Sequence, residues 1–215
     1  MKNNEVVVLL HGIIRTKWSM ILIERALKKH GYQVLNIDYP SRKKDIPTLA
    51  DEIFEKIKTG CDINVTTLHF VTHSMGGIIV RYLLFKYPMN HLGKVVMLSP
   101  PNQGSEVADF LQNNWFYQVV FGPAGQQLTT TAAKNYPQTS SSSYPLGIIA
   151  GNKWWDPLSH SILPSSHDGK VTVESTKLAG MTDHIVLSAT HSFMMYNPKV
   201  IHQVVAFLEQ GHFDR

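Results

Sequence analysis

The chain has 215 residues, of which 43% are hydrophobic and 17% charged, and its formal net charge at pH 7 is +4. This length suits one domain with a single substantial core, and the balanced composition excludes a disordered chain. The basic residues are scattered, and the run Arg42-Lys43-Lys44 lacks the interleaved aromatic residues of a nucleic-acid surface. We therefore expect no nucleic-acid partner.

No segment of the sequence predicts membrane insertion or export. No apolar stretch approaches membrane-spanning length, and the apolar run of residues 6–10 is too short for the core of a signal peptide. The single Cys61 cannot form an internal disulfide, which favours a reducing compartment. We expect a cytoplasmic protein without an integral membrane segment.

Strand and helix patterns alternate along the chain. Short apolar runs predict strands at residues 6–10, 33–38, 67–71, 94–99, 146–150 and 184–188. Amphipathic patterns predict helices at residues 18–30, 45–60, 78–87 and 197–208. Repeated strand-helix-strand units of this length predict an α/β fold, with a mostly parallel sheet of about six strands and helices on both faces. Without a linker or an internal repeat, residues 1–215 should form one domain.

The alternation breaks after Pro100. Residues 105–143 are rich in polar residues, glycine and proline, yet a polar surface loop does not require several large aromatic residues close together. Those aromatic residues are Trp115, Phe116, Tyr117 and Phe121. We interpret residues 105–143 as an insertion after the fourth strand that forms a small cap. Its aromatic residues, with Trp154 and Trp155, would line an apolar acyl pocket or else belong to the core.

The run from Thr72 to Gly77, Thr-His-Ser-Met-Gly-Gly, connects a predicted strand to a predicted helix. This is the layout of a nucleophile elbow, a strained turn that lifts a serine hydroxyl above the sheet. The residues two before and two after the serine must be small. Gly76 meets this requirement, and Thr72 stands where glycine is commoner. The pattern predicts Ser74 as a nucleophile.

A serine nucleophile requires a base, and His191 is the candidate that the predicted topology favours. It follows the last predicted strand, so it should lie at the carboxyl edge of the sheet, on the same side as the elbow. His73 is next to the serine and should point away from it. The weaker alternatives are His160, His167 and His184.

An acyl-transfer site also requires two N–H donors for the oxyanion. The first should be the backbone N–H of Met75, directly after the nucleophile. The second should come from the loop after the first strand, where Gly12 permits the backbone to turn inward and present the N–H of Ile13. We expect His11 to pack structurally.

Asp168 is the candidate for the acid that orients the histidine. It lies in an Asp-Gly turn between the fifth and last predicted strands, and Asp-Gly is also a common turn pair in its own right. Asp156 is the alternative, because it comes sooner after the fifth strand. The chain order Ser, Asp, His favours Asp168, because it is the order found on the sheets of α/β-hydrolases. Asp168 would hold the imidazole tautomer without taking the proton itself.

Taken together, these segments resemble a bacterial α/β-hydrolase of the lipase/esterase type over essentially the whole chain. The segments that carry the resemblance are His11-Gly12, Thr72 to Gly77, Pro100 to Asp109, Asp168 to Val171 and Thr190-His191. The resemblance implies a minimal, single-domain α/β-hydrolase and a carboxyl-ester hydrolase that acts on a small-molecule ester or lipid-like substrate. It implies Ser74, Asp168 and His191 as the triad, Ile13 and Met75 as oxyanion donors, and no cofactor. Asp109 belongs to a segment that resembles a structural loop.

Three other functions are alternatives to ester hydrolysis. An acyltransferase would form the same acyl-enzyme and pass the acyl group to an alcohol or amine. A binding module on an inactive hydrolase fold would leave the Ser, Asp and His set without a purpose. A metal site would require Asp156, His160, His167 or Asp183, whose spacing matches no short ligand motif. We therefore expect neither a metal nor an organic cofactor.

Overall fold

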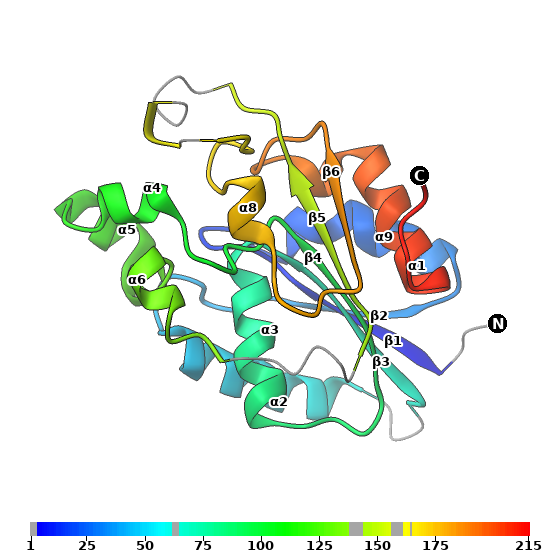
Figure 1. The fold of residues 1–215 in the computed structure, drawn as a ribbon. Helices are drawn as coiled ribbons and strands as arrows, with labels where there is room; N and C mark the ends of the chain where they lie inside the picture. Colours follow the sequence, from blue (N-terminus) through cyan, green and yellow to red (C-terminus); the bar gives the residue numbers. More distant parts are fainter. Residues whose placement is uncertain (1–3, 62–64, 138–143, 156–160, 164) are drawn as a thin grey trace.

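The computed structural model describes residues 4–61, 65–137, 144–155, 161–163 and 165–215, and within them six parallel strands form one sheet (Figure 1). The strands are β1 (Glu5–Leu10), β2 (Gln33–Ile37), β3 (Thr67–His73), β4 (Leu92–Leu98), β5 (Leu146–Gly151) and β6 (Asp183–Leu187). Their order across the sheet is β2-β1-β3-β4-β5-β6, and each neighbouring pair is parallel. The predicted α/β fold with about six strands is confirmed.

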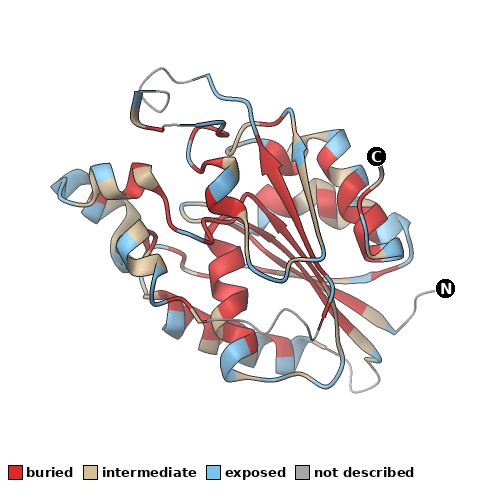
Figure 2. Ribbon diagram, in the orientation of Figure 1, coloured by how far each residue is buried: buried red, intermediate tan, exposed pale blue. Residues whose placement is uncertain are grey.

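Helices cover both faces of this sheet. On one face lie α1 (Ile21–Lys29) and α9 (Pro198–Gln210), and on the other lie α2 (Ile46–Gly60) and α3 (Met75–Lys86) (Figure 1). Alternate residues of a strand point to opposite faces, so Val7 packs toward α1 and α9 while Val8 packs toward α2 and α3. Figure 2 shows the central strands buried along most of their length. Burial on both faces explains why these strands are continuous apolar runs.

Local capping residues set the helix boundaries. The Asp45 side chain accepts a hydrogen bond from the Thr48 N–H and begins α2, and Asn197 caps α9 in the same way. A 3-10 turn, η1 (Lys17–Met20), precedes α1. The single helix predicted for residues 18–30 is therefore divided, since Met20 leaves helical backbone angles.

The described part of the predicted insertion after β4, residues 105–137, contains three helices, α4 (Glu106–Leu111), α5 (Trp115–Gln126) and α6 (Thr130–Ala133). Each begins at a polar side chain that accepts a hydrogen bond from the first turn, namely Ser105, Asn114 and Thr129. Gly122, with a φ of 62°, interrupts the helical backbone of α5 just before Pro123. Figure 1 shows the three helices grouped together beside α8 (Val173–Thr176).

A second 3-10 turn, η3 (Met194–Tyr196), lies just before α9. Within the part of the chain that the structure describes, no helix is both long enough and apolar enough to cross a membrane.

Candidate active site

Ser74 occupies a sharp turn between β3, which ends at His73, and α3, which begins at Met75. Its backbone angles, φ 53° and ψ −123°, are ones that residues with a side chain rarely adopt. Gly76 explains why this turn needs a small residue, because a Cβ there would lie 2.8 Å from the carbonyl oxygen of Leu10. The helix begins three residues earlier than the predicted start at residue 78, and this places Ser74 directly at its amino end.

Three side chains from separate loops are joined by hydrogen bonds at this turn. The Ser74 hydroxyl donates to Nε2 of His191, with Oγ and Nε2 2.9 Å apart. The Nδ1–H of His191 donates to Oδ2 of Asp168 at 2.7 Å. The two bonds require one tautomer, with the proton on Nδ1 and the lone pair of Nε2 facing the serine. The structure thus brings together Ser74, His191 and Asp168.

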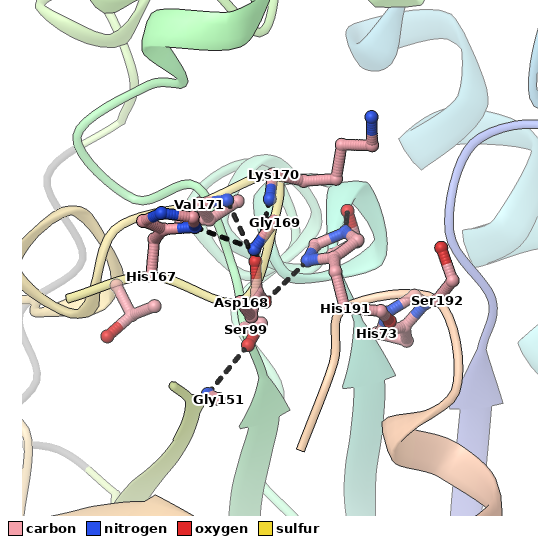
Figure 3. A network of polar contacts seen from close by, with 12 residues as sticks. His73, Ser99, Gly151, His167, Asp168, Gly169, Lys170, Val171, His191 and Ser192 are labelled. Atoms are coloured by element: carbon pink, nitrogen blue, oxygen red, sulfur yellow. Dashed lines mark hydrogen bonds and ion pairs between the residues drawn. The ribbon is translucent and has the colours of Figure 1, made fainter. Parts of the chain in front are cut away.

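The Asp168 carboxylate is buried and bonded on all sides. Its Oδ1 accepts the backbone N–H groups of Lys170 at 3.0 Å and Val171 at 2.9 Å (Figure 3). Burial alone would raise the pKa of Asp168, but the neighbouring His191 and these hydrogen bonds lower it below its usual value. Asp168 is therefore ionised at neutral pH. The alternative acid, Asp156, lies outside the described residues.

Ser99 is a site residue that the sequence analysis missed. It follows β4 directly, is fully buried and has a φ of 41°. Its Oγ accepts the N–H of Gly151 at 3.2 Å, and its hydroxyl donates to the Asp168 carboxylate. One sequence feature could have identified Ser99. It is a serine at the carboxyl end of an apolar strand, β4, which lies between β3, the strand before Ser74, and β5, the strand before Asp168.

The His73 ring lies beside the site, although we expect from the sequence that it points away from Ser74. Its Nε2–H donates to the backbone carbonyl of His191 at 3.0 Å, and a Cβ on Gly12 would lie 2.9 Å from its Nδ1. Burial, together with the charge of His191, lowers the pKa of His73 well below its ordinary value. His73 is therefore a neutral ring that supports the His191 backbone.

The other histidines named in the sequence analysis were His11, His160, His167 and His184. Those that the structure describes form contacts with residues other than Ser74. His11 is buried, stacks on Tyr39 and donates from Nδ1 to the carbonyl of Gly12. His167 accepts the N–H of Gly169 at 3.0 Å and stacks on a tryptophan. His184 is hydrogen-bonded to the Thr176 hydroxyl at 3.0 Å. His160 lies outside the described residues.

The two predicted oxyanion donors, Ile13 and Met75, belong to segments beside Ser74. Ile13 lines the cavity that contains Ser74, and Met75 is the first residue of α3. Among the described residues, neither backbone N–H has a hydrogen-bond acceptor. A positive helix end also favours negative charge near Met75. The roles of Ile13 and Met75 as oxyanion donors stay predictions.

A cavity of about 350 Å³ opens over Ser74 and His191. Its apolar wall comes from the loop after β1, from α4 and α5 and from the segment after α5, and includes Ile13, Val107, Leu111, Tyr117, Phe121 and Leu128. Burial raises the pKa of Tyr117 to about 12, so its hydroxyl stays protonated and donates to the carbonyl of Gly125. The neighbouring aromatic residues on α5 are exposed: Trp115 at 72% and Phe116 at 62%. Of the six aromatic residues named from the sequence, only Tyr117 and Phe121 line the cavity.

Two of the residues considered for a metal, His167 and Asp183, lie in the described part of the chain. Asp183 accepts the N–H of Phe213 and pairs with Arg215. In the described ranges, no three His, Cys, Asp or Glu side chains are grouped so that they could hold a metal ion. Asp156 and His160 fall outside those ranges.

Comparison with known proteins adds a family match and several structural likenesses. The family model described as "alpha/beta hydrolase fold" matches residues 5–167. A Bacillus licheniformis lipase in its mature form has 20% identity and a TM-score of 0.76, over 97% of this chain and 92% of that one. A metagenomic carboxyl esterase has 17% identity and a TM-score of 0.72, over 89% and 65% of the two chains.

A Legionella pneumophila phospholipase has 19% identity and a TM-score of 0.64, over 87% of this chain and 53% of the other. At these identities, the likeness concerns the fold. No curated protein has a sequence that matches the chain.

Proposed function

Because this chain belongs to the alpha/beta hydrolase fold family, we propose that it is a serine carboxyl-ester hydrolase that acts through an acyl-enzyme on Ser74. The observation that carries the proposal is the hydrogen-bonded chain from Ser74 through His191 to Asp168, with distances of 2.9 and 2.7 Å. A serine hydroxyl is a weak nucleophile, and a neutral imidazole acceptor within hydrogen-bond distance activates it.

Acylation begins when Ser74 Oγ attacks the ester carbonyl carbon and its proton moves to Nε2 of His191. Asp168, whose pKa is lowered, stays ionised and stabilises the imidazolium that forms. The carbonyl oxygen becomes an oxyanion that accepts the N–H groups of Ile13 and Met75. The C–O bond of the alcohol then breaks, and Nε2 returns its proton to the departing oxygen.

Deacylation repeats these steps with water. His191 removes a proton from the water as it attacks the acyl-enzyme carbonyl, and the same proton returns to Ser74 Oγ when the acid leaves. An acceptor alcohol in place of water would give the acyltransferase reaction with the same residues. In both steps His191 carries the proton, and the two N–H groups bind the oxyanion.

The insertion of residues 105–143 would act as a cap that binds the acyl chain. Its helices α4 and α5 supply Val107, Leu111, Tyr117 and Phe121 to the apolar wall beside Ser74. Apolar groups gain about 0.8 kcal/mol for each methylene removed from water, so this wall favours an alkyl acyl chain. The cavity, at about 350 Å³, suits a short or medium chain.

The test is hydrolysis of p-nitrophenyl esters from acetate to palmitate by the wild type, Ser74→Ala and His191→Asn. We expect both variants to lose several orders of magnitude in kcat, because each removes a member of a unit that acts together. The matched control is His91→Gln, a change at an exposed histidine in the loop between α3 and β4. Equal slow rates for all four proteins would show that Ser74 is not the nucleophile for esters.

A further inference from the structure

Two cationic side chains border the cavity that contains Ser74. Arg15 lies in the loop after β1, and Lys170 lies in the loop that carries Asp168. Among the described residues that line this cavity, none is acidic. The nearby Asp168 does not line it, since its carboxylate is buried behind His191. Any substrate in the cavity therefore meets a positive charge that no lining residue offsets.

Neither cation is paired with an acid. The Arg15 guanidinium donates from Nη2 to the backbone carbonyl of Ser192 at 3.2 Å, and this bond leaves its other N–H groups free to bind an anion. Lys170 is exposed, and within the described structure neither side chain has a carboxylate at ion-pair distance. In the described structure, therefore, no acidic side chain neutralises either charge.

Both cations belong to loops that are hydrogen-bonded to His191 or to the residue after it. Arg15 is held by the residue that follows His191, and Figure 3 shows the Lys170 side chain extending from the Asp168 loop toward the side where His191 and Ser192 lie. Most of the apolar wall comes from α4 and α5, with Tyr117 and Phe121, and Ile13 adds to it from the loop after β1. The cavity thus has an apolar part and a cationic part.

The chemistry of ester cleavage decides which part of a substrate occupies each region. His191 returns its proton to the departing alcohol oxygen, so that oxygen must come within hydrogen-bond distance of Nε2. The alcohol part of the ester therefore lies on the His191 side, beside the cations, and the acyl chain lies along α4 and α5. From this arrangement we infer that the site takes esters with an apolar acyl chain and an anionic group, a carboxylate or a phosphate, on the alcohol part.

This inference rests on the proposed function and names its substrate class. The test compares three butanoate esters with the same acyl chain: phenyl, meta-carboxyphenyl and meta-trimethylammoniophenyl butanoate. Each kcat/KM is divided by the rate constant for hydroxide hydrolysis, which removes differences in leaving-group reactivity. We expect the normalised value to be highest for the carboxylate and lowest for the ammonium ester.

The variants Arg15→Gln and Lys170→Gln assign the preference to the two side chains. Each should lower the kcat/KM of the carboxyphenyl ester relative to that of the phenyl ester by about tenfold. This is the change expected when one charge-assisted hydrogen bond to the substrate is lost. The matched controls Arg25→Gln and Lys29→Gln remove the same charge from α1 and should keep the ratio. A higher rate with meta-phosphonophenyl butanoate than with the carboxylate would assign phosphate as the group, and the reverse would assign carboxylate.

Two results separate this inference from the proposed function. Ser74-dependent cleavage in which the neutral ester is as fast as the anionic one would overturn the inference and leave the hydrolase intact. If no ester is cleaved in a Ser74-dependent way, calorimetry can still compare the affinity of the protein for meta-hydroxybenzoate, which is anionic, with its affinity for phenol, which is neutral. Tighter binding of the benzoate, lost in Arg15→Gln, would support the inference, and equal binding would overturn it.

Discussion

The Ser99 hydroxyl donates a hydrogen bond to the Asp168 carboxylate from the end of β4. The same oxygen accepts the N–H of Gly151 at the end of β5, so the bond joins the carboxyl ends of two strands to the acid. Ser99 has a left-handed φ of 41°, and this strained backbone turns its hydroxyl toward Asp168. Asp168 is thus held by the sheet as well as by its own loop.

Replacing Ser99 with alanine should destabilise the protein and slow the reaction. The change leaves a buried carboxylate with one donor fewer, so we expect the free energy of unfolding to fall by about 1.5–3 kcal/mol. Urea unfolding measures this loss, and kcat/KM for p-nitrophenyl butanoate measures the effect on the site. Ser188→Ala, at an exposed serine, is the control. An unfolding free energy equal to that of the control would contradict the role given to Ser99.

The exchange of Asp168 for asparagine tests the acid with almost no change of size. An amide cannot stabilise the imidazolium and would favour the wrong tautomer of His191, so kcat should fall by about 10⁴-fold. Stopped-flow or steady-state ester hydrolysis measures this change. Asp156→Asn is the matched control and should keep wild-type kcat. If Asp156→Asn were the slower variant, the alternative acid would be the correct one.

The parts of this molecule that were predictable are those with local signals. Apolar runs of strand length give the sheet, and the small residues around Ser74 give the elbow, because backbone strain restricts which residues can surround it. Asn114 and Thr129 cap helices of the insertion, which the sequence analysis interpreted as a small cap without assigning helices to it.

The rest depends on contacts between distant segments. The Asp168 contact with His191 depends on how two loops pack, so Asp156 could not be excluded from spacing alone. Ser99 is one serine among many until β4 and β5 are seen side by side. His73 supports the backbone of His191, more than a hundred residues later in the chain, and no local pattern predicts this contact.

The Gly76 position should not accept a side chain. A Cβ there would lie 2.8 Å from the Leu10 carbonyl oxygen and 3.0 Å from that of His11, and both are backbone atoms that cannot move aside. We expect Gly76→Ala to lower the free energy of unfolding by about 1–3 kcal/mol and to reduce kcat by displacing Ser74. The control is Gly60→Ala, whose Cβ would meet only the flexible end of the Leu35 side chain. Equal stability of the two variants would mean that the elbow is not tightly packed.

The low pKa of His73 predicts that stability depends on pH. Burial lowers the pKa in the folded protein, whereas the unfolded chain titrates near about 6.5. As the pH falls through that value, the unfolded chain binds a proton that the folded protein does not bind. The free energy of unfolding therefore falls with pH, by at most about 1.4 kcal/mol per pH unit for this group.

His73→Gln should flatten this dependence, because glutamine does not titrate. Urea unfolding at several pH values between about 7 and 5 measures the slope of the unfolding free energy. His91→Gln, at an exposed histidine, should keep the wild-type slope. A His73→Gln slope as steep as that of the control would show that another group is responsible.

Phe121→Ala should shift the acyl preference toward longer chains. Phe121 lines the cavity and stacks on Tyr117 with ring centroids 4.3 Å apart. Removing its ring enlarges the cavity beside Ser74 and makes room for a longer acyl chain. We expect kcat/KM for hexanoate and octanoate to rise relative to butanoate, by about fourfold for each methylene newly removed from water. The control Phe116→Ala removes the same ring from the exposed side of α5. If both variants kept the wild-type chain-length profile, the acyl chain would lie elsewhere, and the cap assigned to residues 105–143 would not bind it.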